Sequence, residues 1–294
     1  IANQLKAIDF AGGTAVHINS GTAGLVLAII LGKRSGWPTT PMRPHNLPFV
    51  MLGAALLWFG WFGFNAGSEF AADGTAGQAW LNTCVATCVA ALGWLIVERI
   101  RDKHATSLGA ASGVVAGLVA ITPAAAAVDV VGSMFVGLAA GVVCALAVGL
   151  KYKFGYDDSL DVVGVHLVGG VIGTVLIGLF ANVTRDADGA VTSSTWAPDG
   201  ALNGLFYGGG WTQLWTQIAV AIIAVVLSGV ITLIIGYALK FTMGWRIPEE
   251  HEVEGVDVTT HGEAAYDLEP SSGASHTSGS LSHVPAHRAQ EAKA

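Results

Sequence analysis

Residues 128–150 read VDVVGSMFVGLAAGVVCALAVGL, and this stretch decides the class of fold. It contains one charged residue, Asp129, which is also the only charged residue between positions 105 and 150. A helix crosses the roughly 30 Å hydrocarbon core of a bilayer with about 20 apolar residues. Because the stretch is long and apolar enough, the sequence predicts a membrane-spanning helix here.

The whole chain shares this character. Of its 294 residues, 52% are hydrophobic and only 12% are charged, whereas a soluble domain carries about 25% charged residues. A soluble enzyme is therefore close to excluded, and no enzymatic activity is expected. The net charge of −7 and the 14 basic residues also argue against a nucleic-acid partner, which would need a dense basic patch.

Seven stretches are long enough, with tilt, to span a bilayer, so the sequence predicts an all-α, polytopic transmembrane helical bundle. Glycine and alanine recur inside them, as in residues 109–113 (GAASG) and 137–141 (GLAAG). Such small residues let helices approach closely in lipid. The predicted spans, of which the fourth is the shortest, are 9–32, 47–68, 80–97, 107–122, 128–150, 161–181 and 212–240.

The basic residues predict the orientation of the spans. The segments outside the spans alternate between two sides of the membrane. On one side they contain many basic residues, and on the other side the only basic residues are Lys6 and Arg185. Because basic connections of membrane proteins stay in the cytoplasm, we expect a multi-pass plasma-membrane protein with a cytoplasmic C-terminus. The basic set comprises Lys33, Arg34, Arg43, Arg99, Arg101, Lys103, Lys151, Lys153, Lys240 and Arg246.

The chain changes character after the predicted transmembrane domain, residues 1–245. Residues 246–267 combine a cluster of glutamates with apolar side chains, and Gly255 and Gly262 divide the segment as turns would. Such a run is usually a solvated acidic tail, but its apolar residues favour a cytoplasmic segment that folds against the basic loops. Residues 268–294 are rich in Ser, His, Gly, Pro and Ala, which predicts a disordered tail.

One pattern occurs twice in the chain. Residues 9–17 (DFAGGTAVH) and 158–166 (DSLDVVGVH) each place an aspartate eight residues before a histidine, and glycines follow four and seven residues after it. The two copies lie on predicted spans of opposite direction. This arrangement indicates an inverted repeat, whose symmetry would bring His17 and His166 together near the middle of the membrane.

The two histidines are the first candidate functional residues. A lone histidine on an apolar helix is more often a packing residue, but ionisable groups inside a membrane are costly and usually line a pathway. Two of them in symmetric positions favour the functional interpretation. Asp9 and Asp158 lie at span ends, where helix capping or electrostatic support is expected. A direct contact of Asp9 with a ligand is the less favoured alternative.

These motifs resemble the signature of the ammonium transporter (Amt/MEP/Rh) family, and the bacterial Amt type in particular. The resemblance covers roughly residues 9 to 267, with several long motifs in the right order. Besides the two histidine motifs, it rests on residues 44–48 (PHNLP), 60–68 (GWFGFNAGS), 116–123 (AGLVAITP) and 255–263 (GVDVTTHGE), with Tyr266.

The resemblance implies roles for particular residues. His17 and His166 match the paired pore histidines of the family, and Asp9 matches an acidic residue near the outer vestibule. The other matches are Ser68 for the hydroxyl of the external ammonium site, Phe64 for a pore-gating phenylalanine, Trp61 for a pore-lining tryptophan and Thr122 for a threonine near the pore.

The resemblance also implies the fold and the partners. Family members have about eleven helices and form trimers with one pore per subunit, and their C-terminal region accompanies docking of a PII-type signalling protein. This chain has only seven predicted spans, so we expect that the first four are missing and that transport belongs to a longer protein. Ammonium or ammonia, with methylammonium as an analogue, is the expected substrate, and no cofactor is expected.

The residue chemistry agrees with this expectation. Trp61, Phe64 and Ser68 follow i, i+3, i+7 spacing and are predicted to line one helical stripe. Spacing alone favours core packing, but the hydroxyl beside the histidine pair favours a pore. Burying an unpaired charge is costly, whereas ammonium can give up a proton and pass the imidazoles as ammonia. Whether the imidazoles also relay that proton, which would make transport electrogenic, stays open.

Two other functional classes stay open. An ammonium sensor that signals through its cytoplasmic tail is the alternative function, and a long appended signalling domain would favour it. An intramembrane metalloenzyme would need a third ligand and an acid/base group at ligand spacing, such as HExxH. The sequence contains no such motif, so no metal site is predicted.

Overall fold

The computed structural model describes residues 4–40, 42–184, 195–264 and 266. The chain divides into two compact units, Ile1–Ile247 and Pro248–Ala294. Within the described residues the structure is helical, and an isolated antiparallel bridge between Val128 and Ala181 is the only strand-like pairing. The predicted all-α class is confirmed. The predicted disorder of residues 268–294 falls outside the described residues.

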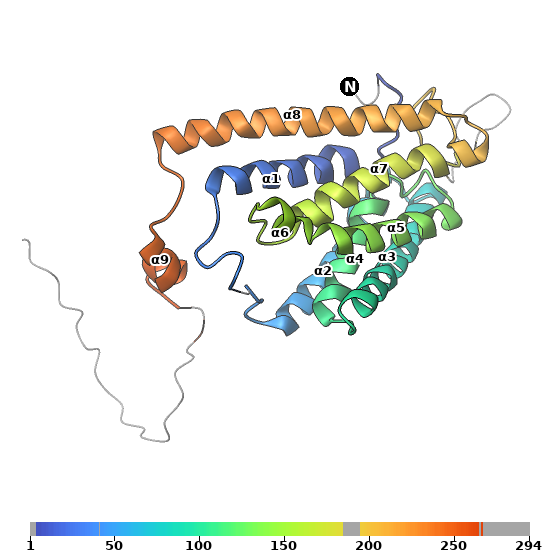
Figure 1. Cartoon of the computed structure of the whole chain (residues 1–294). Coiled ribbons are helices and arrows are strands. Elements are labelled where there is room, and N and C mark those ends of the chain that lie inside the picture. The colour runs from blue at the N-terminus through green and yellow to red at the C-terminus, as the bar shows by residue number, and fades with distance from the viewer. Residues whose placement is uncertain (1–3, 41, 185–194, 265, 267–294) are drawn as a thin grey trace, which may run out of the picture. The chain divides into compact units, whose positions relative to one another are not determined.

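The first unit is a bundle of α-helices (Figure 1). Asn46, Asp73, Thr106 and Asp129 cap the N-termini of α2, α3, α4 and α5 through their side chains, as these residue types commonly do. The α-helices are α1 (Asn19–Leu31), α2 (Leu47–Asn65), α3 (Gly74–Arg101), α4 (Ser107–Ile121), α5 (Val130–Ala147), α6 (Leu150–Phe154), α7 (Val168–Phe180) and α8 (Thr212–Thr242). The π-helical turns η1 (Gly13–Ile18) and η3 (Val163–Leu167) lead into α1 and α7, and the 3₁₀ turns are η2 (Ala66–Glu69) and η4 (Leu205–Tyr207).

Six of the seven predicted spans are long enough and apolar enough to cross a bilayer. The prediction of a full helical span at 107–122 is wrong, because α4 has only 15 residues and rises about 22 Å. Pro123 follows shortly after, and because proline has no backbone N–H it cannot continue the helical hydrogen bonding. The six spans found within the described residues are Gly13–Leu31, Leu47–Glu69, Gly74–Arg101, Val130–Phe154, Val163–Phe180 and Thr212–Thr242.

A buried, non-helical segment, residues 122–128, continues from α4. Irregular backbone at membrane depth is tolerated where protein surrounds it and satisfies its polar groups. The side chain of Asn82 donates to the carbonyls of Ala125 and Val128, and Phe10 and Ala11 donate their backbone amides to this segment. The carbonyl of Val128 also accepts from Gln78. The carbonyls of Ala124, Ala126 and Ala127 accept from backbone amides, namely those of residues 127 and 128, 196 and 182 respectively.

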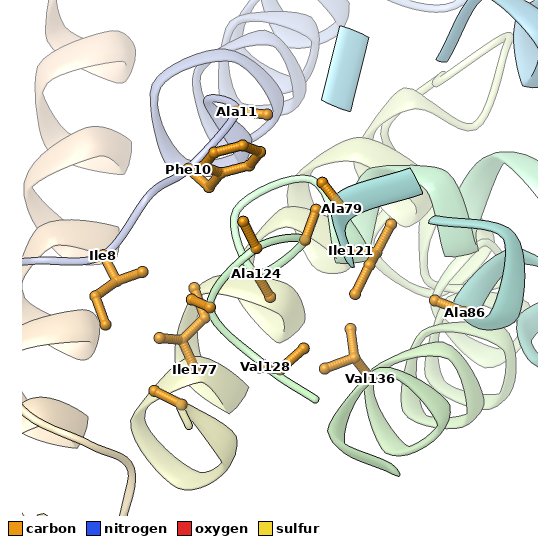
Figure 2. Packing of buried hydrophobic residues seen from close by; sticks show 14 of the residues in the cluster. Ile8, Phe10, Ala11, Ala79, Ala86, Ile121, Ala124, Val128, Val136 and Ile177 are labelled. Atoms are coloured by element: carbon orange, nitrogen blue, oxygen red, sulfur yellow. The ribbon is translucent and has the colours of Figure 1, made fainter. Parts of the chain in front are cut away.

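The largest apolar cluster of the first unit surrounds this segment. In Figure 2, Ala124 and Val128 lie near its centre, with Ile8 and Phe10 to the left and Val136 to the right. Besides residues of α4 and of the segment itself, the labelled residues come from the N-terminal segment, α3, α5 and α7. The core therefore holds the turn after α4 against the residues that precede η1.

The glycine-rich stretches are contact surfaces between helices, as the sequence predicted. A Cβ atom on Gly137 or Gly141 of α5 would lie 2.3 or 2.2 Å from the carbonyl oxygen of Ala86 or Ala90 in α3. Gly113 and Gly117 of α4 approach the same stretch of α3. Only glycine permits such close approach of helix backbones. The packing of α3, α4 and α5 therefore depends on these positions.

The helices that follow the two histidine-bearing turns, α1 and α7, run in opposite directions, and α8 runs parallel to α1 (Figure 1). At one end of the bundle, Gln217 of α8 binds Ile8, and at the other end Lys240 donates to the carbonyl of Ile30. We call the end near Ile8 the Asp9 end, and the end near Ile30 the Lys33 end. Ion pairs between described residues lie at the Lys33 end, among them Arg34–Asp157, Arg101–Asp102 and Lys151–Asp161.

The second unit has ordered secondary structure where it is described. It contains α9 (Glu249–Glu254) and the π-helical turn η5 (Asp257–His261). Gly255 and Gly262 end these two elements with positive φ angles of 114° and 71°, a conformation that glycine adopts without strain. Both glycines thus mark the ends of short helical elements.

Candidate functional site

His17 and His166 face each other at the centre of the candidate site. Their Nδ1 atoms lie 3.4 Å apart and their ring centroids 5.4 Å apart. His17 is 3% exposed, and His166 is partly buried. The sequence repeat thus predicted a pair that the structure brings together. No third potential metal ligand joins the pair within the described residues.

Each histidine lies in a π-helical turn that an aspartate caps. Asp9 accepts hydrogen bonds from the amides of Thr14 and Ala15, at 3.2 and 3.1 Å. Asp158 likewise accepts from the amides four and five residues further on, at 3.0 and 2.8 Å. Short π-helical segments occur often at functional sites. Both aspartates therefore act as caps that fix the start of a histidine-bearing helix.

The environment of the Asp9 carboxyl sets two effects against each other. Burial raises the pKa of Asp9 above its ordinary value, and hydrogen bonds from the backbone amides of residues 12 to 15 partly oppose that rise. The carboxylate is thus occupied by backbone donors. These contacts favour the capping role over direct ligation.

The glycines of the repeat allow the two turns to meet. A Cβ atom on Gly21 would lie 2.3 Å from the backbone nitrogen of Leu167, and one on Gly170 would lie 3.1 Å from that of Ile18. The glycine four residues after each histidine therefore meets the residue that follows the other histidine. This reciprocal contact is what a pseudo-two-fold axis between the two copies would produce.

Thr122 connects His17 to Trp61. Its buried hydroxyl oxygen lies 3.3 Å from His17 Nε2 and accepts a hydrogen bond of 2.9 Å from Trp61 Nε1. The same hydroxyl donates its hydrogen to the carbonyl of Leu118, at 2.7 Å. Because α4 ends at Ile121, the turn that holds Thr122 places this hydroxyl beside the imidazole.

This network assigns the tautomers of the two histidines. A threonine hydroxyl has one hydrogen, and Thr122 gives it to Leu118. His17 must then donate from Nε2, which leaves its Nδ1 as an acceptor. His166 Nδ1 is therefore the donor in the contact between the rings, and His166 Nε2 carries a lone pair.

Aromatic rings cover His17. Trp61 stacks on the imidazole with a centroid distance of 5.3 Å, and Phe64 lies 5.9 Å from it. Ser68 is further along, where its hydroxyl donates to the carbonyl of Phe64 at 2.7 Å. The predicted helical stripe is only partly correct, because α2 ends at Asn65 and Ser68 lies in the 3₁₀ turn η2.

Two threonines next to the site were missed by the sequence analysis. The hydroxyl oxygens of Thr14 and Thr174 lie 2.8 Å apart, and both side chains are buried. This hydrogen bond joins η1 to α7, close to the two histidine-bearing turns. The only sequence feature that could have predicted this contact is a hydroxyl in each of two apolar spans. Hydroxyls are common in such helices, and which of them pair depends on the tertiary fold.

The comparisons with known proteins agree on one family. The profile described as the Ammonium Transporter Family matches residues 1–266. An ammonium transporter from Mycobacterium bovis is 60% identical over 273 residues, which are 93% of this chain and 56% of that protein. The chain thus spans little more than half the length of the curated relatives it matches.

Solved structures show the same fold. Mep2 from Saccharomyces cerevisiae is 35% identical with a TM-score of 0.75, and the match covers 84% of this chain and 55% of that one. A structure titled a sensor Amt protein is 31% identical with a TM-score of 0.76, over 87% of this chain and 61% of that one. The expected polytopic transporter fold is confirmed by these neighbours and by the six apolar spans.

Proposed function

This chain belongs to the ammonium transporter family, and on that premise we propose that the whole protein carries ammonium or ammonia across a membrane past His17 and His166. The chain is a multi-pass membrane protein of a transporter family, not of an enzyme family. The observation that carries the proposal is the contact between two imidazoles, one of which, His17, stacks on Trp61.

Charge explains why ammonia would be the species that passes this site. An ion stripped of water in an apolar passage costs many kcal/mol unless it is paired. Within the described part of the chain, the hydrogen-bond partners of the two imidazoles are Thr122 and each other, and neither is a carboxylate. Ammonium can avoid this cost by releasing a proton, which potassium cannot do. The site therefore favours a substrate that loses its charge before it reaches the histidines.

The aromatic residues fit the recruitment of ammonium. Rings attract a cation by about 0.5–2 kcal/mol, with the larger values in a desolvated setting. Trp61 and Phe64 lie next to His17, and Ser68 follows one turn further along. We propose that the cation binds near Trp61 and Phe64, and that the Ser68 hydroxyl is a hydrogen-bond partner, as the resemblance to the family implies.

The imidazole pair fits the passage of ammonia. In the tautomers assigned above, His166 Nε2 presents a lone pair that accepts an N–H from the substrate. A proton left outside gives net transport of ammonia, whereas a proton relayed through the rings gives net transport of ammonium and an electrical current.

The test is methylammonium uptake and current in liposomes that contain the whole protein. Replacing both His17 and His166 with leucine should reduce uptake about tenfold or more, which is about 1.4 kcal/mol on the barrier, or abolish discrimination against potassium. His104→Gln, an exposed loop variant, is the matched control and should behave as the parent. Unchanged flux and selectivity in the double variant would overturn the proposed mechanism.

An ammonium sensor is the second candidate, and its support is the likeness to the structure titled a sensor Amt protein. Higher identity to proteins named ammonium transporters favours transport. The liposome assay separates the two functions: a sensor would bind methylammonium without accumulating it.

We further propose a homotrimer, a cytoplasmic C-terminus and a regulatory role for residues 246–267. The basic residues gather at the Lys33 end, which supports this orientation. The ordered α9 and η5 support a segment with a binding role, for which a PII-type protein is the family's partner. Chemical crosslinking in native membranes would show the trimer, and cysteine labelling from outside would show the orientation.

A further inference from the structure

Two buried glutamines on α8 hold the residues that precede Asp9. Gln217 is 0% exposed and Gln213 is 2% exposed. Both lie in the first turns of α8, at the Asp9 end of the bundle. Neither residue belongs to the repeated histidine motif. A buried amide costs free energy unless its hydrogen bonds are made, so the partners of these two residues need an explanation.

Gln217 uses every hydrogen-bonding position of its amide. Its Oε1 accepts from the backbone amide of Ile8 at 2.8 Å, and its Nε2 donates back to the carbonyl of Ile8 at 2.7 Å. The second Nε2 hydrogen goes to the carbonyl of Thr174 at 3.1 Å, and Oε1 also accepts from Gln213 at 3.1 Å. Gln217 therefore pairs with Ile8 as a neighbouring strand would.

The other side of Asp9 is held as well. The backbone amides of Phe10 and Ala11 donate to the carbonyls of Pro123 and Thr122, at 3.0 and 3.2 Å. Asp9 is thus fixed between α8 on one side and the turn after α4 on the other. Its carboxylate caps the turn that carries His17.

Gln217 also reaches the helix of the second histidine. It binds the carbonyl of Thr174 in α7, and the hydroxyl of the same threonine lies 2.8 Å from that of Thr14 in η1. One side chain on α8 therefore connects the segment before His17 to the helix after His166. Gln213 differs, because its other partners are Lys6 and Leu202, which lie outside these helices.

We propose that Gln217 is a positioning residue that sets the geometry of the two histidines through Ile8, Asp9 and Thr174. This proposal rests on the proposed transport function of the site. Loss of the amide would remove the hydrogen bonds to the N–H and C=O of Ile8 and the added hydrogen bond to the carbonyl of Thr174, and η1 would shift against α7. A misplacement by about 1 Å of a positioned group can cost about 100-fold in rate.

A purely structural role would give a different result. Other contacts between α1 and α8 remain when Gln217 is changed, such as the hydrogen bond from Ser228 to the carbonyl of Asn19 at 2.8 Å. If Gln217 served only to dock α8, its loss would lower the amount of folded protein and leave discrimination among substrates unchanged. Discrimination is therefore the informative measurement.

The experiment compares Gln217→Met with Gln213→Met in the whole protein in liposomes. Both remove a buried amide from the same helix, one turn apart. We expect Gln217→Met to change the ratio of ammonium to methylammonium transport, or the apparent KM, by about tenfold. Gln213→Met should keep the parent's ratio at comparable thermal stability.

A second variant covers the case in which Gln217→Met does not fold. Gln217→Glu keeps an oxygen for the Ile8 amide but loses the donors to Ile8 and Thr174, and an altered ratio is expected there too. An unchanged ratio in every folded Gln217 variant, with flux that follows stability alone, would overturn the inference. If the parent transports neither substrate, the proposed function fails, and the inference fails with it.

Discussion

At the scale of single residues, the hydroxyl of Thr122 is the most constrained group of the site. It donates to Leu118 and accepts from Trp61 and His17, so its hydrogen has one possible direction. That direction determines which nitrogen of each histidine is protonated. The proton arrangement of the pair is thus set by a residue that is not part of the repeat.

Thr122→Val should test this dependence, because valine has nearly the same shape but no acceptor. The indole N–H of Trp61 and the Nε2–H of His17 would lose their partner, at a cost of about 1–3 kcal/mol in the free energy of unfolding. We expect a lower unfolding temperature in detergent and reduced methylammonium uptake. Thr122→Ser keeps the hydroxyl and should retain most of both. Equal behaviour of the valine and serine variants would contradict the network.

The histidine pair could be predicted from the sequence, whereas this network could not. An aspartate, a histidine and two glycines recur at fixed spacing. Residues at the same spacing on two helices keep the same relative positions in the folded protein. The partners of Thr122 lie on α2 and η1, and their approach depends on where α4 stops. Gln217 was missed for the same reason, because its partners Ile8 and Thr174 are far from it in the chain.

At the scale of secondary-structure elements, the apolar pattern predicted the helices but not all of their ends. Hydropathy is high on both sides of Ile121, so it does not mark the transition from α4 to the buried segment 122–128. Pro123 is the local signal for that transition, because it lacks the amide hydrogen that the helix would need. The donors that make a buried non-helical segment possible, above all Asn82, come from other helices.

The connection between α7 and α8 is anchored to α5 through Asp129. This carboxylate caps α5 through the amide of Gly132 and accepts hydrogen bonds from Tyr207 and Asn182. Burial would raise the pKa of Asp129, but these hydrogen bonds outweigh it and lower the pKa below its ordinary value. The hydrogen bond to Asp129, with burial, raises the pKa of Tyr207 to about 12.

The two shifts predict how stability depends on pH. The lowered pKa of Asp129 gives stability that is present above its unfolded pKa of about 3.9 and is lost as the pH falls through the folded value. The raised pKa of Tyr207 gives stability that is present below about pH 10 and is lost as the pH rises towards 12. Tyr207→Phe should cost about 1 kcal/mol at neutral pH, and the difference in unfolding temperature from the parent should shrink at both extremes. Tyr237→Phe, on the exposed side of α8, is the control. A difference that is constant from pH 3 to pH 12 would rule out this anchor.

At the scale of the whole molecule, the inverted repeat accounts for the position of the site. The two copies of the motif begin antiparallel spans, and each supplies one histidine and one glycine to the same contact. Antiparallel spans follow from the alternation of basic loops in the sequence, so the crossing of α1 and α7 could be predicted. The role of α8 could not, since it has no counterpart in the repeat.

The second unit is where regulation of the whole protein is predicted. Its α9 begins with Glu249, Glu250 and Glu252, whereas the loops at the Lys33 end of the first unit are basic. Part of that positive charge is neutralised within the first unit, because Arg34 and Lys151 pair with Asp157 and Asp161. We predict that the basic residues of the loops 33–43, 99–103 and 151–153 attract the acidic segment.

Deletion of residues 247–267 from the whole protein should therefore impair transport or its response to a PII-type protein by about fivefold or more, the range of a coupling free energy above 1 kcal/mol. The physical reason is that the predicted attraction between the glutamates and the basic loops would be lost at the proposed cytoplasmic side of the protein. Deletion of residues 268–294 alone is the matched control, since it leaves α9 and η5 in place. Added salt should weaken the effect of the segment in the parent, because exposed charges are screened within about 10 Å at 0.1 M ionic strength. Uptake, trimer formation and PII binding that are all unchanged after the 247–267 deletion would show that the segment is a solvated tail, and the charge complementarity would then have no functional consequence.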